Sequence, residues 1–292
     1  MRTIAVSPVS SPAPSSVTPL AAGWRRFALL RILAGTALIV LPVGLTMFAA
    51  HQLVDKSMRG LWPQLLAAAL CVLGYRCYVR SVEGRAMTEF GRAGAGRELG
   101  TGLALGAAMF LLAIGILAAA GAYRVSGSNG WSALLVPSTE LVLVALFEET
   151  LFRGVLQRNL ERALGTWPSV AFSAILFGLA HLPNANATAA AIGVTVVAGL
   201  LFAAAYLATR RLWLAVGMHF AWNFMSDAIF SVTTSGHPGK GILAGSTAGP
   251  DWLSGGAYGI EASVVTLAVL TLFALGLFAA ARRRGMLAAG VA

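Results

Sequence analysis

The stretch LFEETLFRG, residues 146–154, places two glutamates and an arginine at the end of an apolar run, LVPSTELVLVALF, that is typical of a membrane-spanning helix. A charged side chain inside a bilayer costs about 2.5–3.5 kcal/mol on insertion scales, so such residues usually serve a function. Glu148, Glu149 and Arg153 therefore raise two questions: whether the chain crosses a membrane, and what these charges do within it.

The composition answers the first question. Of 292 residues, 58% are hydrophobic and 11% charged, and the mean hydropathy is +0.77, which indicates a polytopic membrane protein. We expect an all-α fold with one membrane domain, 23–285, after a Ser/Pro-rich disordered tail, 1–22, and before a short C-terminal tail, 286–292. A helix needs roughly 20 apolar residues to span a bilayer. About eight ranges qualify: 27–49, 61–82, 99–122, 133–153, 168–186, 188–208, 212–230 and 258–281.

The basic residues support this topology. Seventeen of the 21 fall on the tail, the C-terminus and alternate connections, which is the distribution expected of cytoplasmic segments. Both termini are therefore predicted to be cytoplasmic in a multi-pass protein of the cell membrane. The net charge of +10 does not indicate a nucleic-acid partner, because the basic residues are scattered between apolar runs. The excess of Arg over Lys, with abundant Ala and Gly, indicates a bacterial source.

Two connections are long enough to matter. Residues 84–99, on the predicted cytoplasmic side, read as an amphipathic link on anionic lipid or as a solvated charged loop. Residues 231–257, on the predicted outer side, are rich in Gly, Ser and Thr and read as a flexible loop, a lid or plain disorder.

Helical spacing sorts the intramembrane charges. Residues four apart share a helix face, so Glu149 and Arg153 are predicted to form an ion pair that holds the helix at the membrane boundary, with Arg153 extending toward the interface. Glu148 is turned about 100° away from Glu149 and has no such partner. The two glutamates are therefore predicted to differ in role.

Three further polar residues are predicted to approach Glu148. His219 and Asn223 are four apart on one predicted helix, and His181 lies on another. The helices that carry Glu148 and His181 are predicted to be antiparallel neighbours joined near Leu164, which brings the two side chains to equal depth. We expect the set to converge in the cytoplasmic half of the membrane.

This set suits two chemistries. A carboxylate and an imidazole can hold and deprotonate a water molecule, while a second imidazole and an amide donate to an oxyanion. Alternatively, Glu148, His181 and His219 could ligate zinc. The residues alone leave both open. The chain lacks the residues that other intramembrane proteases use: it has no HExxH or GxSG motif and no paired aspartates on facing spans.

Three motifs carry a family resemblance. Residues 148–154 (EETLFRG) match an EExxxR signature, 177–181 (FGLAH) an FxxxH motif and 219–223 (HFAWN) an HxxxN motif, in that order. Together they resemble the CPBP family, which includes type II CAAX prenyl proteases and the bacterial Abi proteins. The family architecture is an eight-helix bundle, and the motif-bearing core here would cover about 133–230.

The resemblance implies an intramembrane endopeptidase that acts near the cytoplasmic face on a membrane-associated peptide or protein. It implies that Glu148 and His181 activate water, that His219 and Asn223 stabilise the oxyanion, and that Glu149 and Arg153 support them. A mechanism without metal is favoured, and a zinc-dependent variant is the alternative. Two rival classes are a non-enzymatic immunity or scaffold protein of the Abi type and a proton-relaying transporter, although the chain has no internal repeat.

Overall fold

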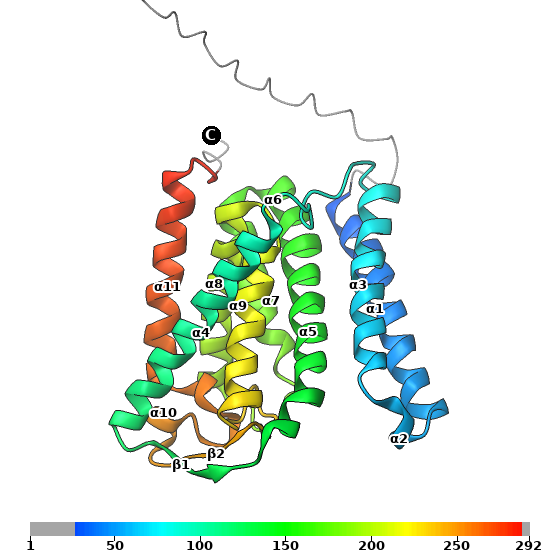
Figure 1. The fold of residues 1–292 in the computed structure, drawn as a ribbon. Helices are drawn as coiled ribbons and strands as arrows, with labels where there is room; N and C mark the ends of the chain where they lie inside the picture. Colours follow the sequence, from blue (N-terminus) through cyan, green and yellow to red (C-terminus); the bar gives the residue numbers. More distant parts are fainter. Residues whose placement is uncertain (1–26, 288–292) are drawn as a thin grey trace, which may run out of the picture.

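The apolar runs fold into helices along most of the chain. The computed structural model describes residues 27–287, so the predicted tail 1–22 and most of 286–292 lie outside the described part. The long helices stand side by side in one bundle, with short elements between them (Figure 1). In chain order, the α-helices of the described part are α1 (Ala28–Leu53), α2 (Lys56–Arg59), α3 (Trp62–Ser81), α4 (Ala95–Ala119), α5 (Leu135–Glu149), α6 (Arg158–Leu164), α7 (Thr166–Ala180), α8 (Ala189–Thr209), α9 (Trp213–Asn223), α10 (Asp251–Ser254) and α11 (Val264–Arg283).

Helices α5 and α9 each continue as a π-helical segment. The π-helical segment Thr150–Gln157 joins α5 to α6 without a break, and a second one, Phe224–Ile229, extends α9. π-helical turns are rare and are often found at functional sites. Both segments begin directly after predicted site residues, Glu149 and Asn223.

Helices occupy all eight predicted ranges, but not all of them are long enough to be assigned as spans. Within residues 27–287, five helical stretches are long and apolar enough to cross a membrane: α1, α4, Trp131–Leu164, α8 and α11. Helix α7 is apolar but ends after 15 residues, at Ala180. The structure agrees with a multi-pass helical membrane protein, while the number of eight spans stays a prediction.

The expectation of a purely helical fold needs one correction. Strand β1 (Tyr123–Ser128) pairs antiparallel with β2 (Leu243–Thr247), and Tyr123 lies opposite Thr247. Gly245 allows this pairing, because a Cβ atom there would lie 2.1 Å from the Phe230 carbonyl oxygen. The connection 231–257 is thus built of β2, α10 and turns rather than being a featureless loop. Strand pairing across so long a sequence distance has no local signal.

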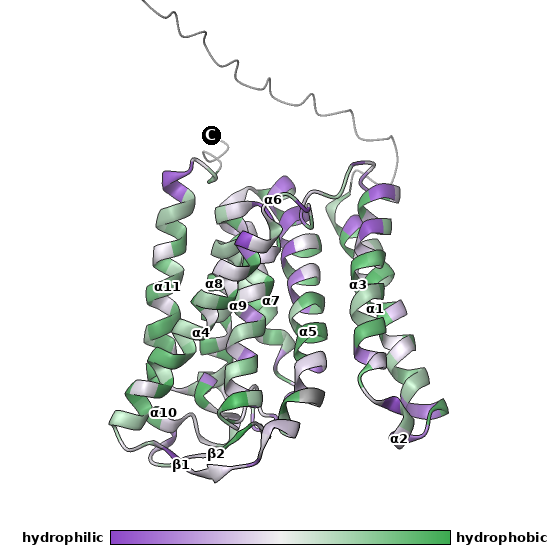
Figure 2. Ribbon diagram, in the orientation of Figure 1, coloured by the Kyte–Doolittle hydropathy of each residue, from purple (hydrophilic) through white to green (hydrophobic). Residues whose placement is uncertain are grey.

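The two ends of the bundle differ in charge. The arginine-rich end, at the top of Figure 2, carries the start of α1, the end of α3, α6 and the end of α11. The hairpin end carries α2, α10 and the paired strands (Figure 1). Between them the helices are mostly hydrophobic (Figure 2). Both ends of the described chain lie at the arginine-rich end, as the predicted topology requires.

The connection at the arginine-rich end is more ordered than predicted. Glu83 and Glu89 have almost no exposed side-chain surface, and they form ion pairs with Arg85, Arg158 and Arg162. Burial alone would lower the pKa of Arg85, but attraction from Glu89 and Glu83 outweighs it and raises that pKa above its usual value. Buried ion pairs therefore fix the first part of the link to the bundle, while Arg92 and Arg97 farther along it are exposed. Contact of that exposed part with lipid stays a prediction.

Helix α9 is held against α4 by small residues. A Cβ atom at Gly102 or Gly106 would lie 2.4 Å from a carbonyl oxygen of α9, that of Leu214 or Met218. Close approach through small residues is a common way to pack helices in membranes. Because His219 follows Met218, this contact also positions a predicted site residue.

Candidate active site

The adjacent glutamates of α5 face different surroundings. Glu148 keeps 21% of its side chain exposed and lines a cavity, whereas the Glu149 side chain is fully buried. One residue turns a helix by about 100°, so neighbours point to different sides. The predicted difference between the two carboxylates is thus present in their geometry.

Glu149 binds two cationic or potentially cationic partners. Its Oε1 atom accepts a hydrogen bond of 3.0 Å from Arg153 and one of 2.9 Å from Nδ1 of His219. Arg153 also donates to the carbonyl oxygen of Gly199 on α8, at 3.0 Å. The predicted Glu149–Arg153 pair therefore exists, and it links three helices.

The expected placement of that pair was wrong. Arg153 is completely buried and does not extend to the membrane boundary. Its guanidinium lies 4.5 Å from the ring centre of Phe177 and 5.3 Å from that of Phe202, where cation–π attraction favours it. The spacing of four was enough to predict the pair, but burial depends on α7 and α8 packing over it.

His219 is held in a defined orientation. Its ring stacks on Phe202, with centroids 4.7 Å apart and planes 14° from parallel. Since a carboxylate can only accept, Nδ1–H of His219 donates to Glu149, and Nε2 is left to face Glu148, 3.9 Å from its Oε2. Phe202 has no part in the three motifs, so sequence reasoning missed this contact.

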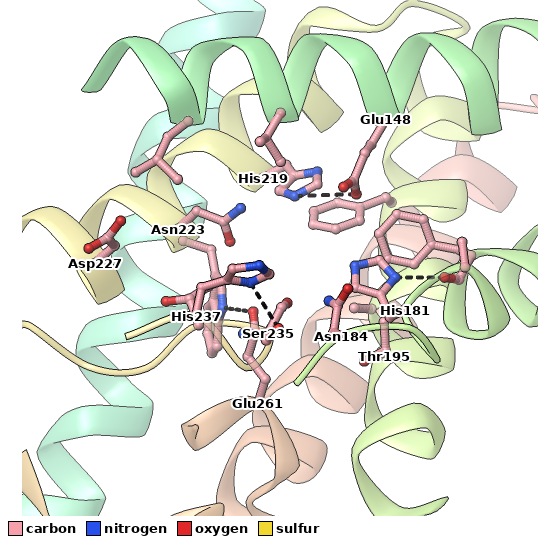
Figure 3. A pocket seen from close by; sticks show the side chains of 18 of the residues that line it. Glu148, His181, Asn184, Thr195, His219, Asn223, Asp227, Ser235, His237 and Glu261 are labelled. Carbon is pink, nitrogen blue, oxygen red and sulfur yellow. Dashed lines mark hydrogen bonds and ion pairs between the residues drawn. The ribbon is translucent and has the colours of Figure 1, made fainter. Parts of the chain in front are cut away.

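His181 comes to the same cavity from the end of α7. Its Nδ1–H donates to the carbonyl oxygen of Phe177 at 2.8 Å, one helical turn earlier. That bond leaves Nε2 of the neutral ring as an acceptor. His181 and Glu148 line one cavity, as the equal-depth prediction expected, and Figure 3 shows both side chains facing its interior.

The cavity brings the predicted residues together. It has a volume of about 780 Å³, and Glu148, His181, His219 and Asn223 all contribute to its wall (Figure 3). Oxygen Oε2 of Glu148 has no hydrogen-bond partner in the described part of the chain, and it lies 3.9 Å from Nε2 of His219. A carboxylate that keeps hydrogen-bonding capacity in the wall of a cavity is suited to bind a water molecule together with its polar neighbours.

The site lies well inside the bundle. Glu148 precedes Arg158, in the charged layer of the arginine-rich end, by ten residues of continuous helix, most of them π-helical. From Glu148 the cavity extends to the hairpin end, where Ser235, His237 and Glu261 line it. Convergence of the set in the cytoplasmic half of the membrane stays a prediction.

Glu261 joins the connection that contains Ser235 to α9. It accepts hydrogen bonds from Nε1 of Trp222 at 3.0 Å and from the backbone N–H and the hydroxyl of Ser235, both at 2.6 Å. Sequence reasoning assigned no role to Glu261 or to His237, because both lie near or within connections. Their spacing has no motif, so only the fold could reveal them.

The residues do not form a metal site as they stand. Within residues 27–287, no group of three His, Cys, Asp or Glu side chains is arranged to hold a metal ion. In the proposed zinc set, Oε2 of Glu148 lies 3.9 Å from Nε2 of His219, and the Nδ1 atoms of His181 and His219 are bound by the Phe177 carbonyl and by Glu149. These hydrogen bonds leave both Nε2 atoms free, which suits water activation and is also the arrangement of zinc-bound histidines. The zinc alternative therefore stays open.

Fold and site together define a helical membrane protein with a cavity between its helices, whose wall carries Glu148, His181, His219 and Asn223. Residues 129–225, which contain all three motifs and most of the cavity wall, match the family model described as type II CAAX prenyl endopeptidase Rce1-like. The match confirms the family resemblance that the motifs indicated, and it supports an intramembrane CAAX-type endopeptidase at the family level. Comparison with curated proteins and with solved structures gave no match.

Proposed function

We propose that this protein is an intramembrane endopeptidase that hydrolyses a peptide bond of a membrane-associated peptide or protein inside the cavity. The observation that carries the proposal is the convergence of four motif residues, from three separate helices, on one cavity around an unpartnered carboxylate oxygen. Residues used only for helix packing are expected to hydrogen-bond fully to each other. Glu149 and His219 do so, whereas Oε2 of Glu148 accepts no hydrogen bond in the described chain and approaches Nε2 of His219 only to 3.9 Å.

In the first step, Glu148 and His181 hold a water molecule between them. As the water oxygen attacks the scissile carbonyl carbon, Glu148 takes one of its protons, in the manner of a general base. Nε2 of His181 accepts a hydrogen bond from the same water and orients its lone pair. The apolar helices around the cavity exclude bulk water and strengthen these interactions.

In the second step, the carbonyl oxygen becomes an oxyanion that needs donors. The Asn223 amide and a protonated His219 supply N–H groups toward it, and the negative charge of Glu149 balances the positive charge of that imidazolium. Glu148 then delivers its proton to the leaving nitrogen as the C–N bond breaks, which restores the carboxylate. Glu149 acts through His219 and is a positioning residue.

The test compares purified protein with its Glu148→Gln and His181→Ala variants on a library of membrane-proximal peptides, in detergent or nanodiscs. We expect cleavage by the wild type and a loss of about 10²–10⁴-fold in rate for Glu148→Gln. Asp55→Asn, on the connection before α2, is the matched control and should cleave normally.

Two outcomes contradict the proposal. Absence of cleavage by the wild type across the library favours the immunity or scaffold class. Cleavage of equal rate in wild type and Glu148→Gln would show that another group activates the water.

A further inference from the structure

The exposed part of the cavity wall lies almost entirely at one end of the molecule. Of the lining residues, those with high exposure are Glu140 in the outer half of α5, His237, Pro238 and Lys240 in the connection at the hairpin end, and Ala180 at the end of α7. Within the described chain, no lining residue comes from the connections of the arginine-rich end. The cavity therefore meets the surface toward the hairpin end.

The opposite direction is blocked by packed side chains. Glu149 and Arg153 are fully buried at the level where the cavity ends, and Arg153 bonds to Gly199 across the bundle. Beyond them, the buried Glu83 and Glu89 ion pairs close the arginine-rich end. A peptide has no route to Glu148 from that side without separating buried, paired charges, which is strongly unfavourable.

A second pocket continues the cavity at the hairpin end. It has a volume of about 790 Å³ and shares Glu140, Asp227, Pro238 and Lys240 with the cavity wall. We call it the hairpin pocket. From these shared residues it passes along β2, where Ala244 and Gly245 line it, and it ends against Asn129 and Ser132.

The hairpin pocket has the chemistry of a peptide-binding groove. Strand backbone and small polar side chains line it, and extended peptides bind beside strands through main-chain hydrogen bonds. The hydroxyl of Ser126 and the amide of Asn129 fix the neighbouring connection by donating to the carbonyls of Ala244 and Gly241. These hydrogen bonds hold the lining of the pocket in place without a bound peptide.

The charge distribution assigns this end to the outer side of the membrane. Within residues 27–287, the connections of the hairpin end carry only Lys56, Arg59, Arg124 and Lys240, whereas most of the other basic residues lie toward the arginine-rich end. We propose that the substrate enters from the arginine-poor, outer face, where an extended segment of a membrane protein lies in the hairpin pocket and reaches Glu148 between Glu140, Asp227 and Lys240. This inference rests on the proposed function for its catalytic outcome, but not for its geometry.

The first experiment tests the opening without using activity. In full-length protein carrying Cys77→Ala, Lys240→Cys marks the cavity mouth and Thr88→Cys, an exposed position at the arginine-rich end, is the control. A membrane-impermeant maleimide should label Lys240→Cys in intact spheroplasts, and Thr88→Cys only in inverted vesicles. Labelling of Lys240→Cys from the inverted side alone would overturn the proposed direction of entry.

The second experiment tests the hairpin pocket. Binding of a fluorescein-labelled, membrane-proximal peptide of about ten residues is measured by anisotropy in the Glu148→Gln background, so that turnover is absent. Ala244→Trp fills the pocket and should raise the Kd at least tenfold, whereas Val125→Trp, on the partner strand and outside the pocket lining, should not. Equal Kd values for the two variants, or no binding at all, would overturn the pocket assignment.

The failures can be told apart. If the peptide is cleaved by inverted vesicles and not by spheroplasts, the protease stands and the outer entrance is wrong. If Lys240→Cys is labelled from outside and no peptide is cleaved from either side, the entrance stands and the proposed function is wrong.

Discussion

At the arginine-rich end, Glu83 and Glu89 are buried and each is bound by at least two arginines, whereas at the hairpin end Glu140 and Lys240 are exposed and line a cavity. The same residue types thus close one end of the bundle and leave the other open. A buried charge must be paired, so the first arrangement is rigid. Exposed groups around a cavity keep free hydrogen-bonding capacity for a ligand. The site combines both arrangements: Glu149 is buried and paired like Glu83 and Glu89, whereas Glu148 lines the cavity like Glu140.

The largest effect should follow from breaking the buried pair next to the site. Arg153→Met leaves the carboxylate of Glu149 buried without its guanidinium, which costs about 3–5 kcal/mol in the free energy of unfolding. Unfolding in mixed micelles measures it. Arg162→Met is the control: its side chain is 37% exposed and Glu83 retains two other arginines, so a loss below about 1 kcal/mol is expected. Equal losses of unfolding free energy in the two variants would show that the buried Glu149–Arg153 pair is no more important than the partly exposed Arg162–Glu83 pair.

The next prediction concerns the contact that places α9. Gly106→Ala puts a Cβ atom 2.4 Å from the Met218 carbonyl oxygen, so α9 must shift, at a cost of about 1–3 kcal/mol. Activity should fall with stability, because His219 moves too. Gly115→Ala, on the same helix with open space around it, should be neutral or slightly stabilising. A neutral Gly106→Ala would show that α4 does not position the site.

Glu149→Gln tests whether the closed region contributes to the chemistry. The amide oxygen can still accept from Nδ1 of His219, but the charge that balances an imidazolium is lost. We expect kcat to fall about 10–100-fold, less than the roughly 10²–10³-fold that follows complete loss of an oxyanion donor, with KM nearly unchanged. The variant also removes the counter-charge of the buried Arg153, so its melting temperature should fall as well, and kcat is compared at a temperature at which both proteins are folded. If this variant folds and cleaves at the wild-type rate, Glu149 is only structural.

The smallest effect is expected from chelation. The site residues do not form a three-ligand set, and the proposed steps use protein groups alone. Activity should therefore be unchanged after dialysis against a chelator, with metal content measured on the same sample. Loss of activity that added zinc restores would support the zinc alternative and assign Glu148 a ligand role.

The outcome of sequence reasoning differed between local and distant features. The Glu149–Arg153 pair and the separation of Glu148 from Glu149 follow from helix periodicity, which is a property of neighbouring residues. The approach of Glu148 and His181 to one cavity followed from counting residues along two antiparallel helices. The contact between Glu149 and His219 was missed, because it joins residues 70 positions apart and no local rule relates them.

By itself, the sequence determined the helical membrane class, the family resemblance and the identity of the polar residues in the bundle, because hydrophobicity, helical period and short motifs are all local. Only the tertiary structure decided where those residues act. Packing of α7 and α8 buries Arg153, pairing of β1 with β2 builds the hairpin pocket, and the ion pairs of Glu83 and Glu89 close the other end. The direction in which a cavity opens depends on which distant segments touch, and that is a property of the folded chain as a whole.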